Sequence, residues 1–225
     1  LVRTCKALYD ITKVYGTPLV SGKDSMKNDF RGKNGRGEAL TISILPTLLV
    51  TAMSRGSLKR SQSSSFKNFG DEIYWIGKRE RGLIGSEYAE HFVISEEEKS
   101  ILDVDVEMNL ALYRRIKIGL ELGLFHSIHD ISDGGVLCAL AECCFGNMMG
   151  VQITLPEISN VSCFSEGTGQ FVVSIPTERQ SGFENLLDGL SFIHLGKVTD
   201  SEHFIVDNVM DEKISDLLSA WTRSF

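Results

Sequence analysis

The sequence lacks an apolar run long enough to cross a lipid bilayer. A membrane-spanning helix takes about 18–20 consecutive apolar residues, whereas the longest candidate, residues 42–52, is shorter and is interrupted by Pro46. A basic segment followed by an apolar stretch, which is typical of an export signal, is also missing. We therefore expect a cytoplasmic protein without a membrane partner.

The cysteines do not show the spacing that would indicate a disulfide framework or a zinc site. The five cysteines are odd in number and show no C-x-x-C spacing, so we expect reduced thiols. They are Cys5, Cys138, Cys143, Cys144 and Cys163.

Positive charge is in deficit. The sequence has 23 Lys and Arg against 30 Asp and Glu, a formal net charge of −7, whereas a general nucleic-acid binder carries clustered excess Lys and Arg. We expect no nucleic-acid partner, and any anionic substrate must be met by local features of the chain. No internal repeat or heptad array is present, which excludes solenoid and coiled-coil architectures.

What is present is the composition of a globular protein, with 42% hydrophobic and 24% charged residues. At about 100–200 residues per domain, 225 residues can form one large domain or two smaller ones. Residues 54–70 contain six serines and little apolar periodicity. We predict a linker at 56–69, between a first part at 1–55 and a second domain at 70–225. The chain begins with Leu1 inside a helical pattern, so we expect a piece of a larger protein.

Capping residues, glycines and apolar spacing divide the chain into alternating helices and strands. The predicted helices are residues 1–15, 86–91, 106–123, 136–145, 177–190 and 212–225, with one further helix start at 95–98. The predicted strands are residues 19–20, one or two within 40–52, and then 72–77, 125–128, 151–155, 171–175, 192–195 and 204–206. This interleaving predicts the α/β class, a mixed sheet with flanking helices.

The segment from His129 to Gly135 lies where a predicted strand leads into a predicted helix. The first backbone N–H groups of a helix have no partner within the helix and attract phosphate, and Gly134 and Gly135 allow a close approach. Asp130 and Asp133 would repel phosphate unless a divalent cation lies between them, and Mg²⁺ binds one or two carboxylates together with phosphate oxygens. The segment therefore favours a magnesium-bridged polyphosphate site. The alternative is that Asp133 is an ordinary N-cap and Asp130 an ordinary turn residue.

A second polar segment follows the predicted strand at 19–20. Lys23 can neutralise a phosphate, with Ser21, Ser25 and backbone N–H groups as hydrogen-bond donors around Gly22 and Asp24. The spacing does not match a Walker A loop, which needs G-x-x-x-x-G-K-[ST] before a helix. An ordinary polar turn is the alternative.

The histidines and two further acids complete the candidates. His126 and His129 point to opposite faces of a strand, and without further soft ligands zinc is not expected. His129, beside Asp130, can act as an acid or base near neutral pH, or can be satisfied by a backbone group. Glu142 lies along the predicted helix, and Glu166 lies in a glycine-bearing loop that is a candidate ligand contact or a solvated loop.

Taken together, these segments resemble a known family. Segments 16–26, 82–88, 129–142 and 164–166 occur in this order in phosphoribosylformylglycinamidine synthases, and the resemblance covers nearly the whole chain. The chain is similar to the second ATP-binding-type half of their synthetase region, in the aminoimidazole ribonucleotide synthetase-like superfamily. The resemblance implies the C-terminal α/β domain of that fold, preceded by the tail of an N-terminal subdomain whose strands build a dimeric or pseudo-dimeric barrel.

The resemblance also implies an activity in de novo purine biosynthesis. ATP activates the amide oxygen of formylglycinamide ribonucleotide, and ammonia from glutamine displaces phosphate to give the amidine. The implied cofactors are ATP and Mg²⁺. The implied metal ligands are Asp130 and Asp133, and the acid/base candidate is His129. The implied substrate and nucleotide contacts are Ser21, Gly22, Lys23, Asp24, Ser25, Gly134, Gly135 and Glu166. The implied partners are the rest of the synthetase, a glutaminase domain or subunit, and a second copy through the barrel strands.

Two features of the family have no counterpart in this sequence: a glycine-rich nucleotide lid with further metal-binding acids, and a glutaminase with its nucleophilic cysteine. We therefore expect the chain to be inactive alone. Because the family's synthetase region is pseudo-symmetric, one alternative is a structural nucleotide-binding half that acts as a scaffold. Another is a different ATP-dependent member of the superfamily, against which the 21–26 run argues.

Overall fold

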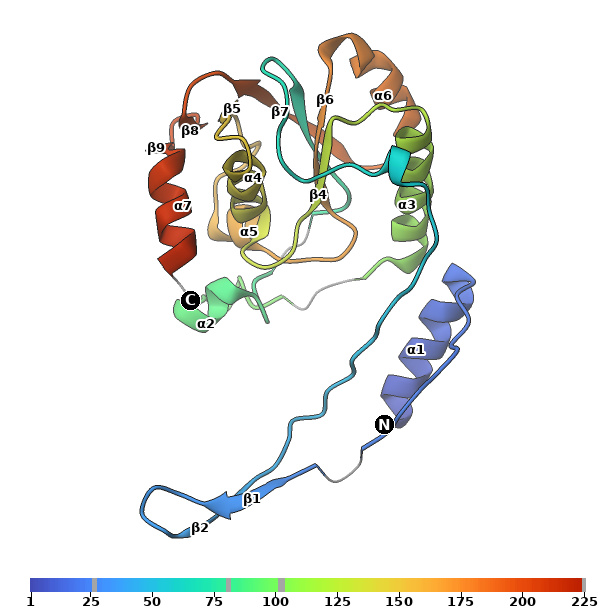
Figure 1. Cartoon of the computed structure of the whole chain (residues 1–225), viewed down its shortest axis with the longest axis vertical. Coiled ribbons are helices and arrows are strands. Elements are labelled where there is room, and N and C mark those ends of the chain that lie inside the picture. Colours follow the sequence, from blue (N-terminus) through green and yellow to red (C-terminus); the bar gives the residue numbers. More distant parts are fainter. Residues whose placement is uncertain (26–27, 80–81, 101–103, 224–225) are drawn as a thin grey trace. The chain divides into compact units, whose positions relative to one another are not determined.

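The computed structural model describes residues 1–25, 28–79, 82–100 and 104–223, and it divides the chain into two compact units, Leu1–Gly56 and Ser57–Phe225 (Figure 1). Met26, at the end of the 21–26 run, lies outside the described residues. Within the described part, no helix is long and apolar enough to span a membrane.

The first unit consists of helix α1 (Val2–Tyr15) and a hairpin of strands β1 (Phe30–Lys33) and β2 (Ala39–Ile42). Helix α1 ends before Gly16, as predicted. The predicted strand at 19–20 is wrong, since those residues are neither helix nor strand. Of the described residues in 40–52, only those of β2 form a strand, and β1 was not predicted. Local apolar content suggested those strands, but a strand also needs a pairing partner.

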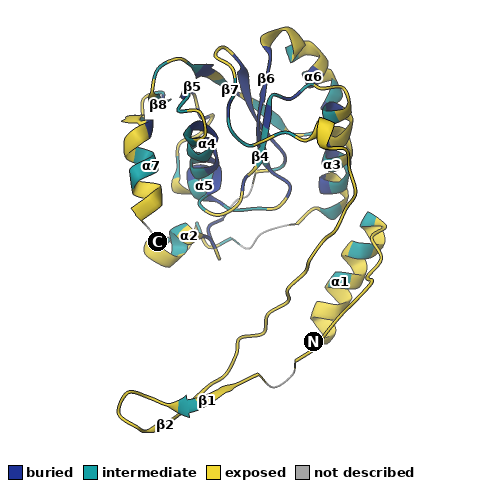
Figure 2. Ribbon diagram, in the orientation of Figure 1, coloured by how far each residue is buried: buried dark blue, intermediate teal, exposed yellow. Residues whose placement is uncertain are grey.

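None of the described residues of the first unit is buried, and Figure 2 shows its ribbon as exposed or intermediate throughout. Large apolar side chains along residues 40–53 are exposed, Leu45 and Leu49 by 80% and 88%. The unit therefore does not enclose a hydrophobic core of its own in this structure.

The second unit is built on a seven-stranded mixed sheet in the order β4-β6-β3-β7-β5-β8-β9. All neighbouring pairs are antiparallel except β5 and β8, which are parallel. The strands are β3 (Glu72–Ile76), β4 (Ser127–Asp130), β5 (Gly150–Ile153), β6 (Phe171–Ile175), β7 (Phe192–Thr199), β8 (His203–Val206) and β9 (Met210–Lys213).

Helices cover both faces of this sheet (Figure 1). On one face, α4 (Gly135–Phe145), α5 (Asn160–Phe164) and α7 (Ile214–Arg223) pack over a core that includes Trp75 and Leu140. On the other, α3 (Val106–Glu121) and α6 (Gln180–Leu186) pack over a second core, which includes Tyr74 of β3 and Phe183 of α6. The predicted α/β class, a mixed sheet with flanking helices, is confirmed.

Strand β3 lies in the interior of the sheet, between β6 and β7, and contributes side chains to both cores. Its five residues are all buried because both faces are covered by helices. Successive side chains alternate between the faces, so Ile73 and Trp75 enter the core under α4 while Tyr74 and Ile76 enter the core under α3.

Several element boundaries differ from the predictions. Residues 95–98 form a turn closed by the Glu98 carboxylate, which accepts a hydrogen bond from the backbone N–H of Ser95 at 2.8 Å. Strand β4 is shifted two residues along the chain, and β9 occupies the predicted start of the last helix. Thr177 opens a 3-10 turn (Thr177–Arg179) before α6, and its hydroxyl donates to Glu72 instead of capping a helix. The short helix α2 (Glu87–His91) begins after its N-cap Ser86, as predicted.

The serine-rich segment contains one 3-10 turn (Leu58–Arg60) and then packs against the second unit. Phe66 is fully buried in the core under α4, its N–H donates to the carbonyl of Cys143 at 2.8 Å, and its carbonyl accepts from the side chain of Asn147 at 2.6 Å. The segment also pairs with β4, because the N–H of Ile128 donates to the carbonyl of Ser63. The end of the segment is therefore fixed to the sheet.

Candidate functional site

The junction between β4 and α4 forms the centre of the candidate site. Ile131 is buried after β4, and its N–H donates to the carbonyl of Gln170. The chain then turns through Gly134 and Gly135, whose φ angles are +80° and +72°, a conformation that glycine adopts without steric cost. Gly134, not Asp133, occupies the N-cap position of α4, and no side chain caps the helix there. The interpretation of Asp133 as an ordinary N-cap is therefore wrong.

His129 connects the end of β4 to α4. It pairs in register with Val172, a residue of the core under α4, so its imidazole lies on the sheet face that α4 covers. Its Nε2 lies 2.6 Å from a carboxylate oxygen of Glu142, and its Nδ1 lies 3.3 Å from a carboxylate oxygen of Asp130. The imidazole thus bridges two carboxylates from two different elements.

Asp130 is the more accessible of these two acids, with 65% of its side chain exposed. Its second carboxylate oxygen accepts a hydrogen bond from the hydroxyl of Ser132 at 3.0 Å. Partial burial alone would raise the pKa of Asp130, but the Ser132 hydrogen bond and the nearby His129 outweigh that effect, so the pKa is lowered. Asp130 is therefore a carboxylate at neutral pH, as a metal or cation ligand must be.

Glu166 occupies the helix N-terminus at which phosphate binding was predicted. One carboxylate oxygen accepts hydrogen bonds from the N–H of Gly134 and the N–H of Glu87, both at 2.8 Å. It therefore connects the starts of α4 and α2, where a negative charge is favoured by the helix dipole. In this arrangement Glu166 acts as an internal anion.

Gly135 has a packing role in this structure. A Cβ atom built there would lie 2.6–2.8 Å from backbone atoms of Phe164 and Cys163. Because those contacts are with backbone, α4 and α5 approach each other this closely only with glycine at this position. The close approach that the sequence predicted is thus made by a neighbouring helix.

The thiol of Cys138 lies on α4 within the same region. Burial is the main cause that raises its pKa, and the charges of Glu142 and Glu166 add to this effect. Burial likewise raises the pKa of Cys144 to about 12. Both thiols are therefore protonated near neutral pH and are poor nucleophiles.

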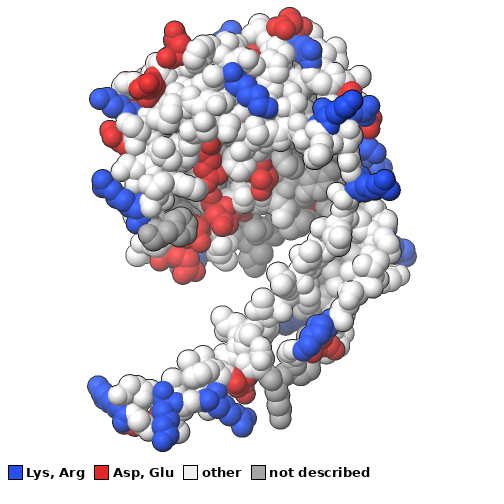
Figure 3. Space-filling model, viewed as in Figure 1, with Lys and Arg blue, Asp and Glu red and all other residues white. Residues whose placement is uncertain are grey.

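Acidic side chains dominate the surface over this site. Figure 3 shows Asp and Glu atoms gathered over the region of α4, α5 and α2, with few Lys or Arg atoms among them. Among the residues that the structure describes, however, no group of three or more His, Cys, Asp and Glu side chains is arranged to enclose a metal ion. The carboxylate oxygens at this site therefore fit a cation that takes its remaining ligands from a bound molecule, as Mg²⁺ does with phosphate oxygens.

The predicted contacts Ser21, Gly22, Lys23, Asp24 and Ser25 all lie in the first unit, and all are exposed. The Lys23 ammonium donates hydrogen bonds to the carbonyl of Asp24 and the hydroxyl of Ser25. The segment forms neither helix nor strand. In this unit the ammonium is held by its own turn.

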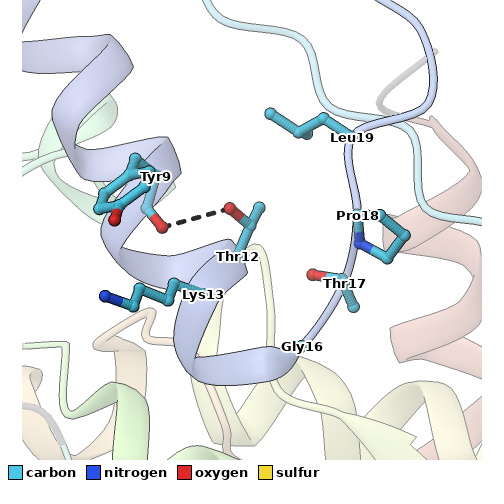
Figure 4. A pocket seen from close by; sticks show the side chains of 7 residues that line it. All are labelled: Tyr9, Thr12, Lys13, Gly16, Thr17, Pro18 and Leu19. Carbon is cyan, nitrogen blue, oxygen red and sulfur yellow. Dashed lines mark hydrogen bonds between the residues drawn. The ribbon is translucent and has the colours of Figure 1, made fainter.

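An open pocket lies just before that segment, at the end of α1 (Figure 4). The side chains drawn there come from α1 and from the turn that follows it, and the hydroxyl of Thr12 donates to the carbonyls of Leu8 and Tyr9 within the helix. The lining residues are Tyr9, Thr12, Lys13, Gly16, Thr17, Pro18 and Leu19. None of the predicted site residues lines this pocket.

The sequence did not predict two contributions to the site. Trp221 on α7 donates its indole N–H to Glu142 at 3.2 Å, and the backbone N–H of Glu87 binds Glu166. Trp221 follows Ile214 and Leu217 on one helical face, a spacing that could have identified it as lying on the packed side of α7, where it contacts α4. No sequence pattern predicts a hydrogen bond between the start of one helix and a carboxylate in a distant loop.

Comparisons with known proteins agree with this architecture. Among curated proteins, the phosphoribosylformylglycinamidine synthase subunit PurL of Prochlorococcus marinus is 29% identical over 239 residues, which covers 96% of this chain and 29% of that protein. The PurL subunit of Thermoplasma acidophilum is 28% identical over 228 residues, which covers 98% of this chain and 28% of that protein. The chain thus spans less than a third of the length of these relatives.

Solved structures show the same fold. A structure described as Thermotoga maritima PurL complexed with FGAR superposes with a TM-score of 0.65 at 17% identity, covering 92% of this chain and 36% of that chain. Escherichia coli HypE, a hydrogenase maturation protein, has a TM-score of 0.52 at 14% identity, covering 68% of this chain and 52% of that chain. A family model described as AIR synthase related protein, C-terminal domain, matches residues 68–208. The chain therefore belongs to the AIR synthase related family, and most of its second unit is the C-terminal domain of that family.

Proposed function

We propose that this chain is part of the synthetase region of a phosphoribosylformylglycinamidine synthase, an ATP-dependent carbon–nitrogen ligase of purine biosynthesis. The observation that carries the proposal is the similarity to PurL subunits over 96–98% of the chain, which extends through both units. The substrate is then formylglycinamide ribonucleotide, and the nitrogen donor is ammonia derived from glutamine. The length covered, less than a third of each relative, supports a fragment that is inactive alone.

The candidate site supports nucleotide binding through a bridging cation. Asp130 and Asp133 are the proposed Mg²⁺ ligands, since both are exposed carboxylates, one at the end of β4 and one in the turn before α4. When bound, Mg²⁺ would neutralise phosphate charge beside these acids. Gly134, Gly135, Glu166 and the 21–25 segment are the proposed nucleotide and substrate contacts, and His129 is the acid/base candidate.

One observation favours a second candidate function, a structural half that supports the rest of the synthetase. The Gly134 N–H, which was predicted to bind phosphate, already donates to Glu166. A helix N-terminus occupied by a protein carboxylate offers less to an incoming phosphate than an open one. This arrangement is expected of a half that binds nucleotide weakly or not at all.

The partners follow from the same proposal. The first unit exposes apolar side chains along 40–53 and buries none of its described residues, so it is expected to complete a barrel with the rest of the synthetase or with a second copy. A glutaminase domain or subunit would supply ammonia, and the location would be the cytoplasm.

Calorimetry on the full-length protein tests the proposal. Asp130→Asn combined with Asp133→Asn should weaken ADP binding in the presence of Mg²⁺ at least about tenfold, because both proposed cation ligands are lost. The matched control is Asp211→Asn, which alters an exposed acid that pairs with His203 on the β8–β9 hairpin. Unchanged ADP affinity in the double variant would refute the metal assignment. Intact turnover in Lys23→Ala and Asp130→Asn, with a lower melting temperature, would favour the scaffold.

A further inference from the structure

Glu142 lies outside the proposed ligand contacts, yet both of its carboxylate oxygens are engaged at the site. One lies 2.6 Å from Nε2 of His129 on β4, and the other accepts the indole N–H of Trp221 on α7 at 3.2 Å. The side chain is only one-third exposed, and that of His129 only 18% exposed. The contact between His129 and Glu142 is therefore partly shielded from water, whereas the hydrogen bond from Trp221 is exposed.

The position of Glu142 follows from the register of α4. It lies seven residues, about two helical turns, after Gly135, so it faces the same side of the helix as the start of α4. His129 faces α4 from β4 because it shares its sheet face with Val172. The pair thus spans the gap between strand and helix beside the β4–α4 junction.

Trp221 fixes the other side of the carboxylate. Its indole ring also packs against Phe145 on α4, with ring centroids 5.9 Å apart. Helix α7 is anchored by Ile214, which is fully buried in the core under α4. An amphipathic helix therefore holds one oxygen of the carboxylate while the imidazole holds the other.

The constraint reaches Asp130 through the imidazole. Glu142 determines the orientation of the His129 ring, because a second hydrogen-bond partner fixes the ring nitrogen that faces away from the ligand. The other ring nitrogen then lies 3.3 Å from one oxygen of Asp130, while Ser132 holds the second oxygen. The carboxylate is held from both sides without any contact between Glu142 and Asp130 being needed.

We propose that Glu142 and Trp221 are positioning residues for the candidate site, because they hold His129 against Asp130 and so preset the direction of the Asp130 carboxylate. This inference rests on the proposed function, in which Asp130 binds a cation with nucleotide. It assigns α7, which provides none of the proposed ligand contacts, an effect on ligand affinity through Glu142 and His129.

The test measures ADP binding to the full-length protein by calorimetry across a Mg²⁺ titration. Glu142→Ala should raise the Mg²⁺ concentration for half-maximal binding at least about tenfold, the usual effect of losing a residue that orients a metal ligand. Glu142→Gln keeps an oxygen that accepts from the imidazole, so it should restore most of the loss. Trp221→Phe keeps a smaller aromatic ring near Phe145 and removes the indole N–H, so it should give a smaller shift in the same direction.

Asp211→Asn is the matched control, because it breaks another 2.6 Å histidine–carboxylate pair, with His203, on the β8–β9 hairpin. It should leave the Mg²⁺ midpoint unchanged. If Glu142→Ala lowers only the melting temperature and leaves the midpoint at the wild-type value, the positioning role is refuted. If Glu142→Ala does not fold, Trp221→Phe carries the same test, and a wild-type midpoint there refutes the role of α7.

A wild-type protein that shows no Mg²⁺-dependent ADP binding would refute the proposed cation site and not the positioning role. A crystal structure of the Glu142→Ala protein then decides the second question. Movement of the His129 ring out of contact with Asp130 supports the inference, and an unchanged His129–Asp130 contact overturns it.

Discussion

Substitution of Gly135 by alanine tests whether packing, and not ligand approach, requires glycine at the start of α4. At φ +72°, an alanine costs about 1–2 kcal/mol in backbone strain. Its Cβ would also lie 2.6–2.8 Å from backbone atoms of Phe164 and Cys163, which cannot move aside as a side-chain end can. Overpacking of this kind costs typically about 1–3 kcal/mol. We expect Gly135→Ala to lower the free energy of unfolding by about 2–5 kcal/mol.

Substitutions at two other glycines distinguish the cost of backbone strain from the cost of overpacking. Gly134 has φ +80°, but a Cβ there would meet only the side chain of Cys138, so Gly134→Ala should cost about 1–3 kcal/mol, mostly strain. Gly182 lies in α6, has no positive φ, and has no atom within 4 Å of the position that an alanine methyl would take. Gly182→Ala should therefore stabilise the protein by about 0.5–1 kcal/mol.

The assay is equilibrium urea unfolding followed by far-ultraviolet circular dichroism. With a slope of about 1–3 kcal/mol per molar urea, a loss of about 3 kcal/mol, near the middle of the expected range, moves the midpoint by about 1–3 M. The reasoning is refuted if Gly135→Ala unfolds within about 0.5 M of wild type, or if Gly134→Ala is the more damaging of the two variants.

Three further predictions concern the core. The carboxylate of Glu72 accepts hydrogen bonds from Lys197 and His194. Burial alone would raise its pKa, but these hydrogen bonds outweigh burial and lower the pKa from its ordinary value of 4.5. The stabilising effect of Glu72 is therefore complete above that pH and is lost as the pH falls through the folded-state pKa. Glu72→Gln should flatten the acid limb of a profile of unfolding free energy against pH. Phe66→Ala should cost about 3–5 kcal/mol in urea unfolding, because the ring is fully buried, and a cost below about 1 kcal/mol would show that the serine-rich segment is not fixed to the sheet. Tyr74→Phe should cost about 1–2 kcal/mol at pH 7, measured in the same way, because it removes the 2.6 Å hydrogen bond to Glu184; no loss would contradict that contact.

The sequence predicted the elements of the second unit where local signals agree with the fold. The strand at 72–77 and the helices at 106–123 and 136–145 were located to within two residues, because apolar spacing is a local property. The N-cap Ser86 likewise located the start of α2. Local sequence signals failed where pairing with another strand determines the secondary structure. Residues 212–213 were predicted to begin the last helix, but they pair with β8 as part of the edge strand β9.

The candidate site shows the same division. The sequence alone determined that carboxylates and glycines lie between a strand and a helix at residues 129–135, since that needs only local order along the chain. Only the tertiary structure decided what those groups contact. Glu166, Phe164 and Trp221 reach the site from distant parts of the sequence, because sheet pairing and helix packing bring them there. Contacts between distant segments depend on the three-dimensional packing of both cores, which no local pattern encodes.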